Sequence, residues 1–277
     1  MEAHITALAK AAASLHIHCQ HLDDAGNLVR LSHQGRNCIF QSNRTPFNTE
    51  VMAGICLDKG HTYQLLKDAV PMPRTLAILD FAVAPRYRQY LALRSLDQAL
   101  ARIEDEFDYP VVVKRNRGAL ASNVFLCHDP GAVADALGRI FDRQRHSYDF
   151  IALAQEFLPT AREYRVVCHE GEVVFAYERV LEQSDFKAAY WTLPGGAARY
   201  IGDRARWRTF EDFAAPIFQV LPLGFVGLDV LETRDGRLVL LELNSGPRFD
   251  HISENEGDDA VVAMYRRVLG RYFGIPL

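Results

Sequence analysis

Alternating apolar and polar residues over 227–244, GLDVLETRDGRLVLLELN, predict a β-hairpin. Asp235-Gly236 is typical of a two-residue hairpin turn, and such a turn fixes which residues of the two strands face each other. It sets Asp229 opposite Glu242 on one face of the ribbon. The opposite face is apolar and needs a core. Its expected pairs are Leu228 with Leu243 and Val230 with Leu241.

Two carboxylates that face each other on neighbouring strands repel unless a positive charge lies nearby. Asn244, expected opposite Gly227, adds an amide oxygen to the same face. Oxygen ligands from Asp229, Glu242 and Asn244 suit a hard divalent cation, Mg²⁺ or Mn²⁺, which usually keeps waters and also binds substrate phosphates. The alternative is a solvated strand face whose charges are tolerated because water weakens their repulsion.

The rest of the chain alternates between helical and strand-like patterns. Helices are expected near residues 3–15, 49–69, 96–107, 131–143 and 258–272, and strands near 16–22, 28–31, 37–41, 111–114, 124–127 and 151–157. Pro71 and Pro73 mark a connector after the second helix. Residues 183–201 are expected to form a loop. Because strands, helices and hairpins are interleaved without an internal repeat, we expect an α+β fold with antiparallel sheets.

A second hairpin is expected around Glu170-Gly171. The face that its turn defines carries Arg165, beside Ala176, together with Glu163 and Glu178. Arg179 is expected to start the next loop. An arginine flanked by carboxylates is commonly a structural ion pair, so this pattern alone does not indicate a functional site.

Two lysines are candidates for phosphate contacts. Lys114 ends an apolar, β-branched strand and precedes the loop 115–123, RNRGALASN, whose Gly118 and small residues allow close approach to a ligand. The loop lacks the spacing of a P-loop, and a basic loop of this kind is more often a solvated turn. Lys59 lies within a helical pattern, where a lysine is normally solvated or covers apolar surface.

Length, charge and cysteine content exclude some classes of function. The chain has 277 residues, 49% of them hydrophobic, and a net charge of −4, which gives no argument for nucleic-acid binding. The five cysteines form no C-x-x-C pair, and we see neither a signal peptide nor a membrane-spanning stretch, so a cytoplasmic protein without a membrane partner is expected. His16, His18 and His21 suggest a metal site, because alternating histidines on a strand share a face. The tract lacks the acidic or cysteine companions of a closed zinc site, so a surface strand is the better interpretation.

Read together, the motifs resemble the ATP-grasp superfamily of carboxylate–amine ligases, and most closely its branch of ribosomal-protein glutamate ligases, cyanophycin synthetases and glutathione synthetases. The order of the motifs carries the resemblance: residues 39–73 with Asp58-Lys59, then YPVVVK, AQEFLP, EYRVVCHEGEVVFAYERV and GLDVLETRDGRLVLLELN. It covers roughly residues 39–270. It implies an ATP-grasp fold in which two α+β lobes hold ATP between antiparallel sheets. The expected division is a shortened pre-grasp region at 1–50, an N-terminal lobe at 51–150 and a C-terminal lobe at 151–277.

The resemblance also implies roles for individual residues. Nucleotide contacts fall to Lys59, Lys114, Gln155, Glu156, Phe157, Leu158 and Glu163, with Glu163 on the ribose and the backbone of 156–158 on adenine. Arg165 and Arg179 are the implied catalytic residues, which neutralise phosphate and an acyl phosphate. Asp229, Glu242 and Asn244 are the implied ligands of Mg²⁺ or Mn²⁺. The implied reaction joins a small-molecule or peptide carboxylate to an amine and forms an amide.

Departures from the family pattern concern the substrates. The region before the grasp segment is short, which puts in doubt the substrate contacts and the dimer surface that this region supplies in relatives. A homodimer is still one of the expected possibilities. Lys187 stands where an arginine is common, and Arg248 and His251 lie beside the metal end of the hairpin. We take these three residues as candidates for substrate binding. Two other functions remain open: a small-molecule kinase that phosphorylates a hydroxyl, and a nucleotide-binding protein without turnover.

Overall fold

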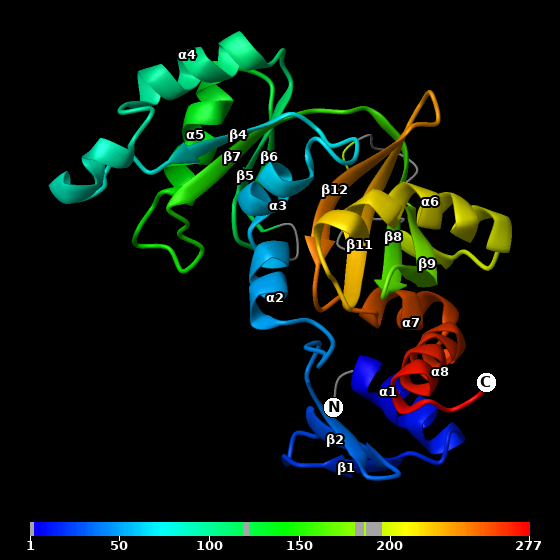
Figure 1. Cartoon of the computed structure of the whole chain (residues 1–277). Coiled ribbons are helices and arrows are strands. Elements are labelled where there is room, and N and C mark those ends of the chain that lie inside the picture. Colours follow the sequence, from blue (N-terminus) through cyan, green and yellow to red (C-terminus); the bar gives the residue numbers. More distant parts are fainter. Residues whose placement is uncertain (1–2, 119–121, 181–185, 187–195) are drawn as a thin grey trace.

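The computed structural model describes residues 3–118, 122–180, 186 and 196–277, and in this part of the chain the strands form three sheets (Figure 1). The helices are α1 (Ala3–Ser14), α2 (Glu50–Leu57), α3 (Lys59–Leu66), the 3-10 helix η1 (Pro85–Tyr90), α4 (Leu96–Glu106), α5 (Pro130–Ile140), α6 (Arg204–Val220), α7 (Asp250–Glu256) and α8 (Asp259–Phe273). The strands are β1 (His18–His21), β2 (Leu28–His33), β3 (Arg36–Gln41), β4 (Thr75–Leu79), β5 (Val111–Arg115), β6 (Val124–Cys127), β7 (Ile151–Glu156), β8 (Thr160–His169), β9 (Glu172–Val180), β10 (Ala197–Tyr200), β11 (Phe225–Thr233) and β12 (Leu238–Asn244). All strand pairs are antiparallel, which confirms the predicted α+β class.

The N-terminal region packs on the C-terminal helix. Strands β1, β2 and β3 form a three-stranded sheet, and α1 lies against α8 (Figure 1). Ile5 and Leu8 of α1, Leu31 of β2 and Val268 of α8 belong to one buried cluster, so the first forty residues share a core with the end of the chain.

Strands β4, β7, β5 and β6, in that order, form a four-stranded sheet. Helices α4 and α5 pack against this sheet through the buried side chains of Ile103, Val133 and Leu137. Side chains cap both helices, because Ser95 accepts from Gln98 N at the start of α4 and Asp129 accepts from Ala132 N at the start of α5.

The third sheet has the order β10-β9-β8-β11-β12, and α6 covers one of its faces (Figure 1). The alternation along β11 explains how this sheet serves both packing and chemistry. Leu228 and Val230 enter the core beneath α6, whereas Asp229 and Leu231 line a pocket on the opposite face. The predicted three-part division of the chain stays a prediction; β7 pairs with β4 and β5, on the N-terminal side of the expected boundary at residue 150.

The hairpin β11–β12 confirms the pairing of Asp229 with Glu242, and of Gly227 with Asn244. The turn itself differs from the prediction. Thr233 N donates to Arg237 O at 3.0 Å, so the loop has three residues, with Gly236 at φ 83°. This shifts the register by one residue, and Val230 therefore pairs with Leu240, so the predicted Val230–Leu241 pair is wrong. A bulge at Leu241 restores the predicted register beyond it.

The hairpin β8–β9 has the predicted two-residue turn, with Glu170 at φ 50° and Gly171 at φ 88°. An irregularity next to Val167 then shifts the pairing by one residue. Arg165 faces Tyr177, and Arg179 lies within β9 opposite Glu163. The predictions that Arg165 lies beside Ala176, and that Arg179 starts a loop, are therefore wrong. Glu178 faces Tyr164, on the other side of the sheet.

The predicted bounds of the other helices and strands agree only in part with the structure. The helical stretch predicted over 49–69 is broken at Asp58, whose backbone is extended with φ −100° and ψ 99°. Strand β4 and helix α6 were not expected. His18 and His21 lie in the surface strand β1, as predicted. None of the helices in the described ranges has the length and apolar character needed to cross a membrane.

Candidate active site

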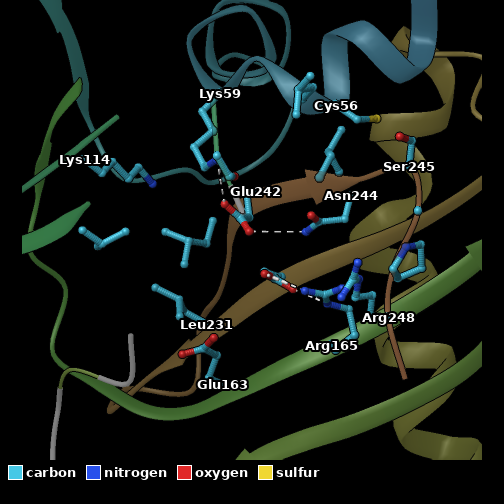
Figure 2. Close-up of a pocket in the computed structure, with 18 of the residues that line it drawn as sticks. Cys56, Lys59, Lys114, Glu163, Arg165, Leu231, Glu242, Asn244, Ser245 and Arg248 are labelled. Atoms are coloured by element: carbon cyan, nitrogen blue, oxygen red, sulfur yellow. Dashed lines mark hydrogen bonds and ion pairs between the residues drawn. The ribbon is translucent and has the colours of Figure 1, made fainter. Parts of the chain in front are cut away.

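A cavity of about 860 Å³ lies between the four-stranded and five-stranded sheets. Figure 2 shows Lys59 and Lys114 on one side of it, and Glu242, Asn244 and Arg165 on the other. The predicted site residues that line the cavity are Lys59, Lys114, Gln155, Glu156, Phe157, Leu158, Glu163, Arg165, Arg179, Asp229, Glu242, Asn244, Arg248 and His251. Lys187 lies outside the described residues.

Asp229 is the centre of a buried ion network on β8, β9 and β11. Arg165 forks over its carboxylate, with Nη2 at 3.1 Å from Oδ2. Arg179 Nη2 lies 3.0 Å from Oδ1 and 3.1 Å from Oδ2, and its Nη1 contacts Glu163. All four side chains are at least nine-tenths buried. The positive charges of the two arginines match the negative charges of the two carboxylates, and only such pairing makes their burial possible.

A glycine on β11 makes room for this network. A Cβ atom at Gly227 would lie 3.0 Å from Cδ of Arg165 and 2.9 Å from Cβ of Pro247. Because glycine has no side chain, Arg165 can lie across β11 and reach Asp229.

Glu242 and Lys59 meet on the face of the hairpin β11–β12 that lines the cavity. Lys59 Nζ is 3.4 Å from Glu242 Oε2 and donates to the carbonyl of Gly118 at 2.9 Å. Asn244 Nδ2 donates to Glu242 Oε1 at 3.3 Å. Burial raises the pKa of the Glu242 carboxyl, but the charges of Lys59 and Lys114 outweigh it and lower this pKa to about 2. Glu242 is therefore anionic at neutral pH.

Lys114 is almost fully buried at the end of β5, with 4% of its surface exposed. Its ammonium donates to Gln155 Oε1 at 2.9 Å, and Gln155 Nε2 donates to Thr75 Oγ1 at 2.8 Å. Burial lowers the pKa of Lys114 to about 8, although the nearby Glu242 carboxylate opposes this shift. An anion in the cavity would raise this pKa and keep the lysine charged at higher pH.

The donor set on the hairpin fits Mg²⁺ bound together with phosphates. In the described ranges no three His, Cys, Asp or Glu side chains form a group that could hold a metal by themselves. The face offers two carboxylates and one amide oxygen, and Mg²⁺ commonly takes one or two carboxylates plus substrate phosphates and waters. The repulsion between the carboxylates does not by itself require a metal, because arginines engage Asp229 and Lys59 engages Glu242.

The end of β7 forms another wall. Arg74 binds the Glu156 carboxylate twice, through its backbone N–H and its Nε, both at 2.9 Å. These two bonds fix the Glu156 side chain, and Glu156, Phe157 and Leu158 line the cavity at this end of β7.

The segment 43–48 also lines the cavity, through Asn43, Arg44, Thr45 and Asn48, and was not predicted from the sequence as part of the site. Asn48 holds it in place, since its Oδ1 accepts from Gly224 N at 2.9 Å and its Nδ2 donates to Phe225 O. A Cβ atom at Gly224 would lie 2.0 Å from the carbonyl oxygen of Phe47. The glycine before β11 and the run of polar residues at 41–45 were the available signals, but neither says where the segment docks.

Comparisons with known proteins agree with this geometry. A bifunctional glutathione synthetase from Pasteurella multocida has a similar structure, with a TM-score of 0.59 and 13% identity, covering 99% of this chain and 43% of that one. The ATP-grasp ligase PsnB, solved with a precursor variant, Mg and ADP, has a TM-score of 0.56 at 18% identity, covering 84% of this chain and 62% of that one. These likenesses confirm the ATP-grasp fold. ATP and Mg²⁺ are the cofactors that ligases with this fold use.

An uncharacterised protein of Mycoplasma pneumoniae, the MG012 homolog, is 27% identical over 153 residues, which are 54% of this chain and 48% of that protein. The chain thus spans about half the length of this curated relative. The model of the RimK-like ATP-grasp domain matches residues 75–268, which include the four-stranded sheet, the five-stranded sheet and most of α8. The chain belongs to the RimK-like ATP-grasp family.

Proposed function

We propose that this protein is an ATP- and Mg²⁺-dependent ligase that joins a carboxylate, of an amino acid or peptide, to an amine. The observation that carries the proposal is the cavity between the two sheets. It brings Lys59, Lys114 and Arg165 together with the acidic face of Asp229 and Glu242. Basic groups for phosphates and oxygen donors for Mg²⁺ are what a phosphoryl-transfer site needs, and no side chain has to form a covalent bond.

The reaction has two balanced steps. The substrate carboxylate attacks the γ-phosphorus of ATP, the bond to the β-phosphate oxygen breaks, and an acyl phosphate and ADP form. The amine then attacks the acyl carbon, phosphate leaves, and an amide results. Acceleration comes from positioning and charge neutralisation.

The nucleotide is assigned to the side of the cavity formed by the four-stranded sheet and the start of α3. The backbone of 156–158 binds adenine and Glu163 binds the ribose. Lys59 and Lys114 bind phosphates. Lys114 suits this role because it is buried, retains donors beyond its bond to Gln155, and would keep its charge to higher pH with a phosphate beside it.

Asp229, Glu242 and Asn244 would hold the metal, which would supply positive charge against the phosphate oxygens. Arg165 and Arg179 stabilise the charge of the acyl phosphate. Their buried pairing with Asp229 and Glu163 keeps both guanidinium groups in fixed positions, so little ordering is needed during the reaction. Arg248 and His251, with Lys187, are assigned to the substrates.

Release of ADP and phosphate across panels of carboxylates and amines tests this proposal, with mass spectrometry of the products. A ligase releases both in equal amounts and only when both substrates are present, and it yields a product lighter by one water than the two substrates together. ADP without free phosphate, in the presence of a hydroxyl acceptor, would instead identify a kinase. Nucleotide binding without any release of ADP would identify a binding protein.

A further inference from the structure

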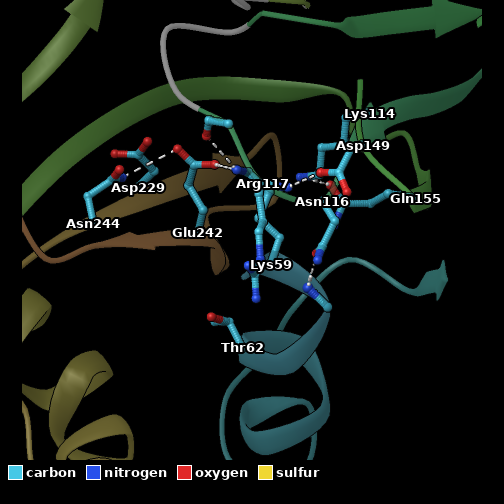
Figure 3. Close-up of polar contacts among 12 residues, drawn as sticks. Lys59, Thr62, Lys114, Asn116, Arg117, Asp149, Gln155, Asp229, Glu242 and Asn244 are labelled. Carbon is cyan, nitrogen blue, oxygen red and sulfur yellow. Dashed lines mark hydrogen bonds and ion pairs between the residues drawn. The ribbon is translucent and has the colours of Figure 1, made fainter. Parts of the chain in front are cut away.

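The loop after β5 and the start of α3 are joined by a set of partly buried polar contacts (Figure 3). The loop residues Asn116 and Arg117 lie against Asp58, which separates α2 from α3. None of these three residues is a direct phosphate or metal ligand in the proposed function. Their placement next to Lys59 and Gly118 nevertheless requires an explanation.

Asp58 does more than cap a helix. Its Oδ1 accepts from His61 N at 3.0 Å, which caps α3, and its backbone N–H donates to Gly54 O at 3.2 Å, which ends α2. Its second oxygen, Oδ2, lies 3.2 Å from Nε of Arg117. Only 2% of Asp58 is exposed. A helix cap at a surface needs neither this burial nor a bond to a cation on another element, because water can serve the remaining oxygen.

The loop side is equally fixed. Asn116 is fully buried, and its Oδ1 accepts from Gly60 N at 2.8 Å, while its backbone N–H donates to Ile151 O at 3.1 Å. Asp149, of which 5% is exposed, accepts from Arg117 N at 2.6 Å. The loop is thus held to β7 by its backbone and to α3 by two side-chain contacts.

These contacts determine where Lys59 lies. Lys59 directly follows Asp58, and its ammonium bridges Gly118 O at 2.9 Å and Glu242 Oε2 at 3.4 Å. A shift of α3 relative to the loop would move the ammonium away from both. Burial raises the pKa of the Asp58 carboxyl, but the His61 N–H, the Asn116 side chain and Arg117 hold it below its ordinary value, so Asp58 is anionic at neutral pH.

We propose that Asp58 and Arg117 are positioning residues of the phosphate site, whose ion pair joins α3 to the loop 115–118 so that Lys59 and the loop meet the nucleotide phosphates as one unit. The inference rests on the proposed function. Its competitor is a purely structural role for Asp58, in which the cap of α3 matters and Arg117 does not.

Two substitutions separate the roles. Asp58→Asn keeps the shape and the cap acceptor but removes the charge that holds Arg117. Arg117→Gln removes the guanidinium and leaves the cap untouched. Arg145→Gln is the matched control, since it breaks a surface ion pair with Asp142 from an arginine whose side chain is 54% exposed, against 51% for Arg117.

Calorimetry with Mg²⁺ and ADP gives the first readout, because it needs no acceptor substrate. We expect both variants to weaken binding about tenfold and to raise the KM for ATP by a similar factor, with an unchanged KM for the amine. The double variant should bind ADP with Mg²⁺ as tightly as the single variant of lower affinity, because both substitutions remove the same ion pair. Arg117→Lys should restore part of the affinity, and the control should match the wild type.

The outcomes separate this inference from the proposed function. Wild-type affinity in Arg117→Gln would overturn the inference and assign Asp58 to the helix cap alone, and additive losses in the double variant would do the same. If Asp58→Asn fails to fold, Arg117→Gln still decides. Failure of the wild-type protein to bind ADP with Mg²⁺ would contradict the proposed function itself.

Discussion

Lys59 and Glu242 form an ion pair in the wall of the cavity, with Nζ 3.4 Å from Oε2, and they come from parts of the chain nearly two hundred residues apart. Lys59 begins α3, which is tied to the loop of the four-stranded sheet, whereas Glu242 lies on β12 of the five-stranded sheet. The pair therefore joins the two sides of the proposed nucleotide site. The positive charges of Lys59 and Lys114 lower the pKa of Glu242, so this carboxyl stays ionised although Asp229 lies opposite it.

Glu242→Gln should lower turnover by about 100-fold or more while leaving the fold intact, because it removes the charge proposed to bind the metal without changing the shape of the side chain. The checks are the rate of ADP release and a thermal unfolding curve. Glu104→Gln, on an exposed position of α4, is the matched control. Unaltered turnover in Glu242→Gln would contradict the assignment of Glu242 to the metal.

Binding of ADP should stabilise the folded protein in a manner that depends on Mg²⁺. At a free nucleotide concentration 100 times Kd, the free energy of unfolding rises by about 2.7 kcal/mol. Because the proposed Mg²⁺ would link the diphosphate to the carboxylates of Asp229 and Glu242, EDTA should remove most of this gain. Thermal shift measured with ADP, with and without Mg²⁺ and EDTA, tests this. An equal shift in EDTA would rule out the proposed metal role.

Affinity for ADP with Mg²⁺ should fall as the pH rises through about 8, where buried Lys114 loses its proton. Bound phosphate raises the pKa of Lys114, so binding above pH 8 should take up a proton, which calorimetry in buffers of different ionisation enthalpy detects. In Lys114→Met the affinity should be lower at pH 7, and this pH dependence should disappear. A wild-type affinity that stays constant between about pH 7 and 9.5 would contradict the role of Lys114.

The same shift has an opposite effect on the empty protein. The pKa of Lys114 is about 8 in the fold, against 10.5 for a lysine exposed to water, so the unfolded chain binds more protons between these values. The contribution of Lys114 to the free energy of unfolding therefore rises with pH across this window. Denaturant titrations of wild type and Lys114→Met at pH 7.5 and 9.5 should show the difference.

The sequence predicted the pairing of Asp229 with Glu242 although it predicted the wrong turn. Two one-residue irregularities cancel, since the longer loop at 234–236 shifts the register and the bulge at Leu241 shifts it back. The run Leu240-Leu241 hides the bulge, because either leucine can face the core. On β9 nothing cancels the irregularity next to Val167, and the prediction for Arg179 failed there.

Residues that act through tertiary contacts could not be predicted from pattern. Asp58 was placed inside a helix because its neighbours have helical spacing, and its extended backbone depends on contacts with Arg117 and Asn116 more than fifty residues away. The segment 43–48 likewise depends on the close approach of Phe47 to Gly224. Such positions follow from how elements pack, and local periodicity carries no information about that.

Asp229→Asn should destabilise the protein strongly, unlike Glu242→Gln. Asp229 is the shared partner of Arg165 and Arg179, and all three are buried. Removing its charge leaves a guanidinium excess inside the sheet, and breaking a buried pair in this way costs about 3–5 kcal/mol. Urea denaturation without nucleotide measures the loss. Glu242→Gln is the matched comparison because Glu242 is partly exposed and its partner Lys59 keeps the carbonyl of Gly118. Equal stability of the two variants would show that the arginines do not depend on Asp229.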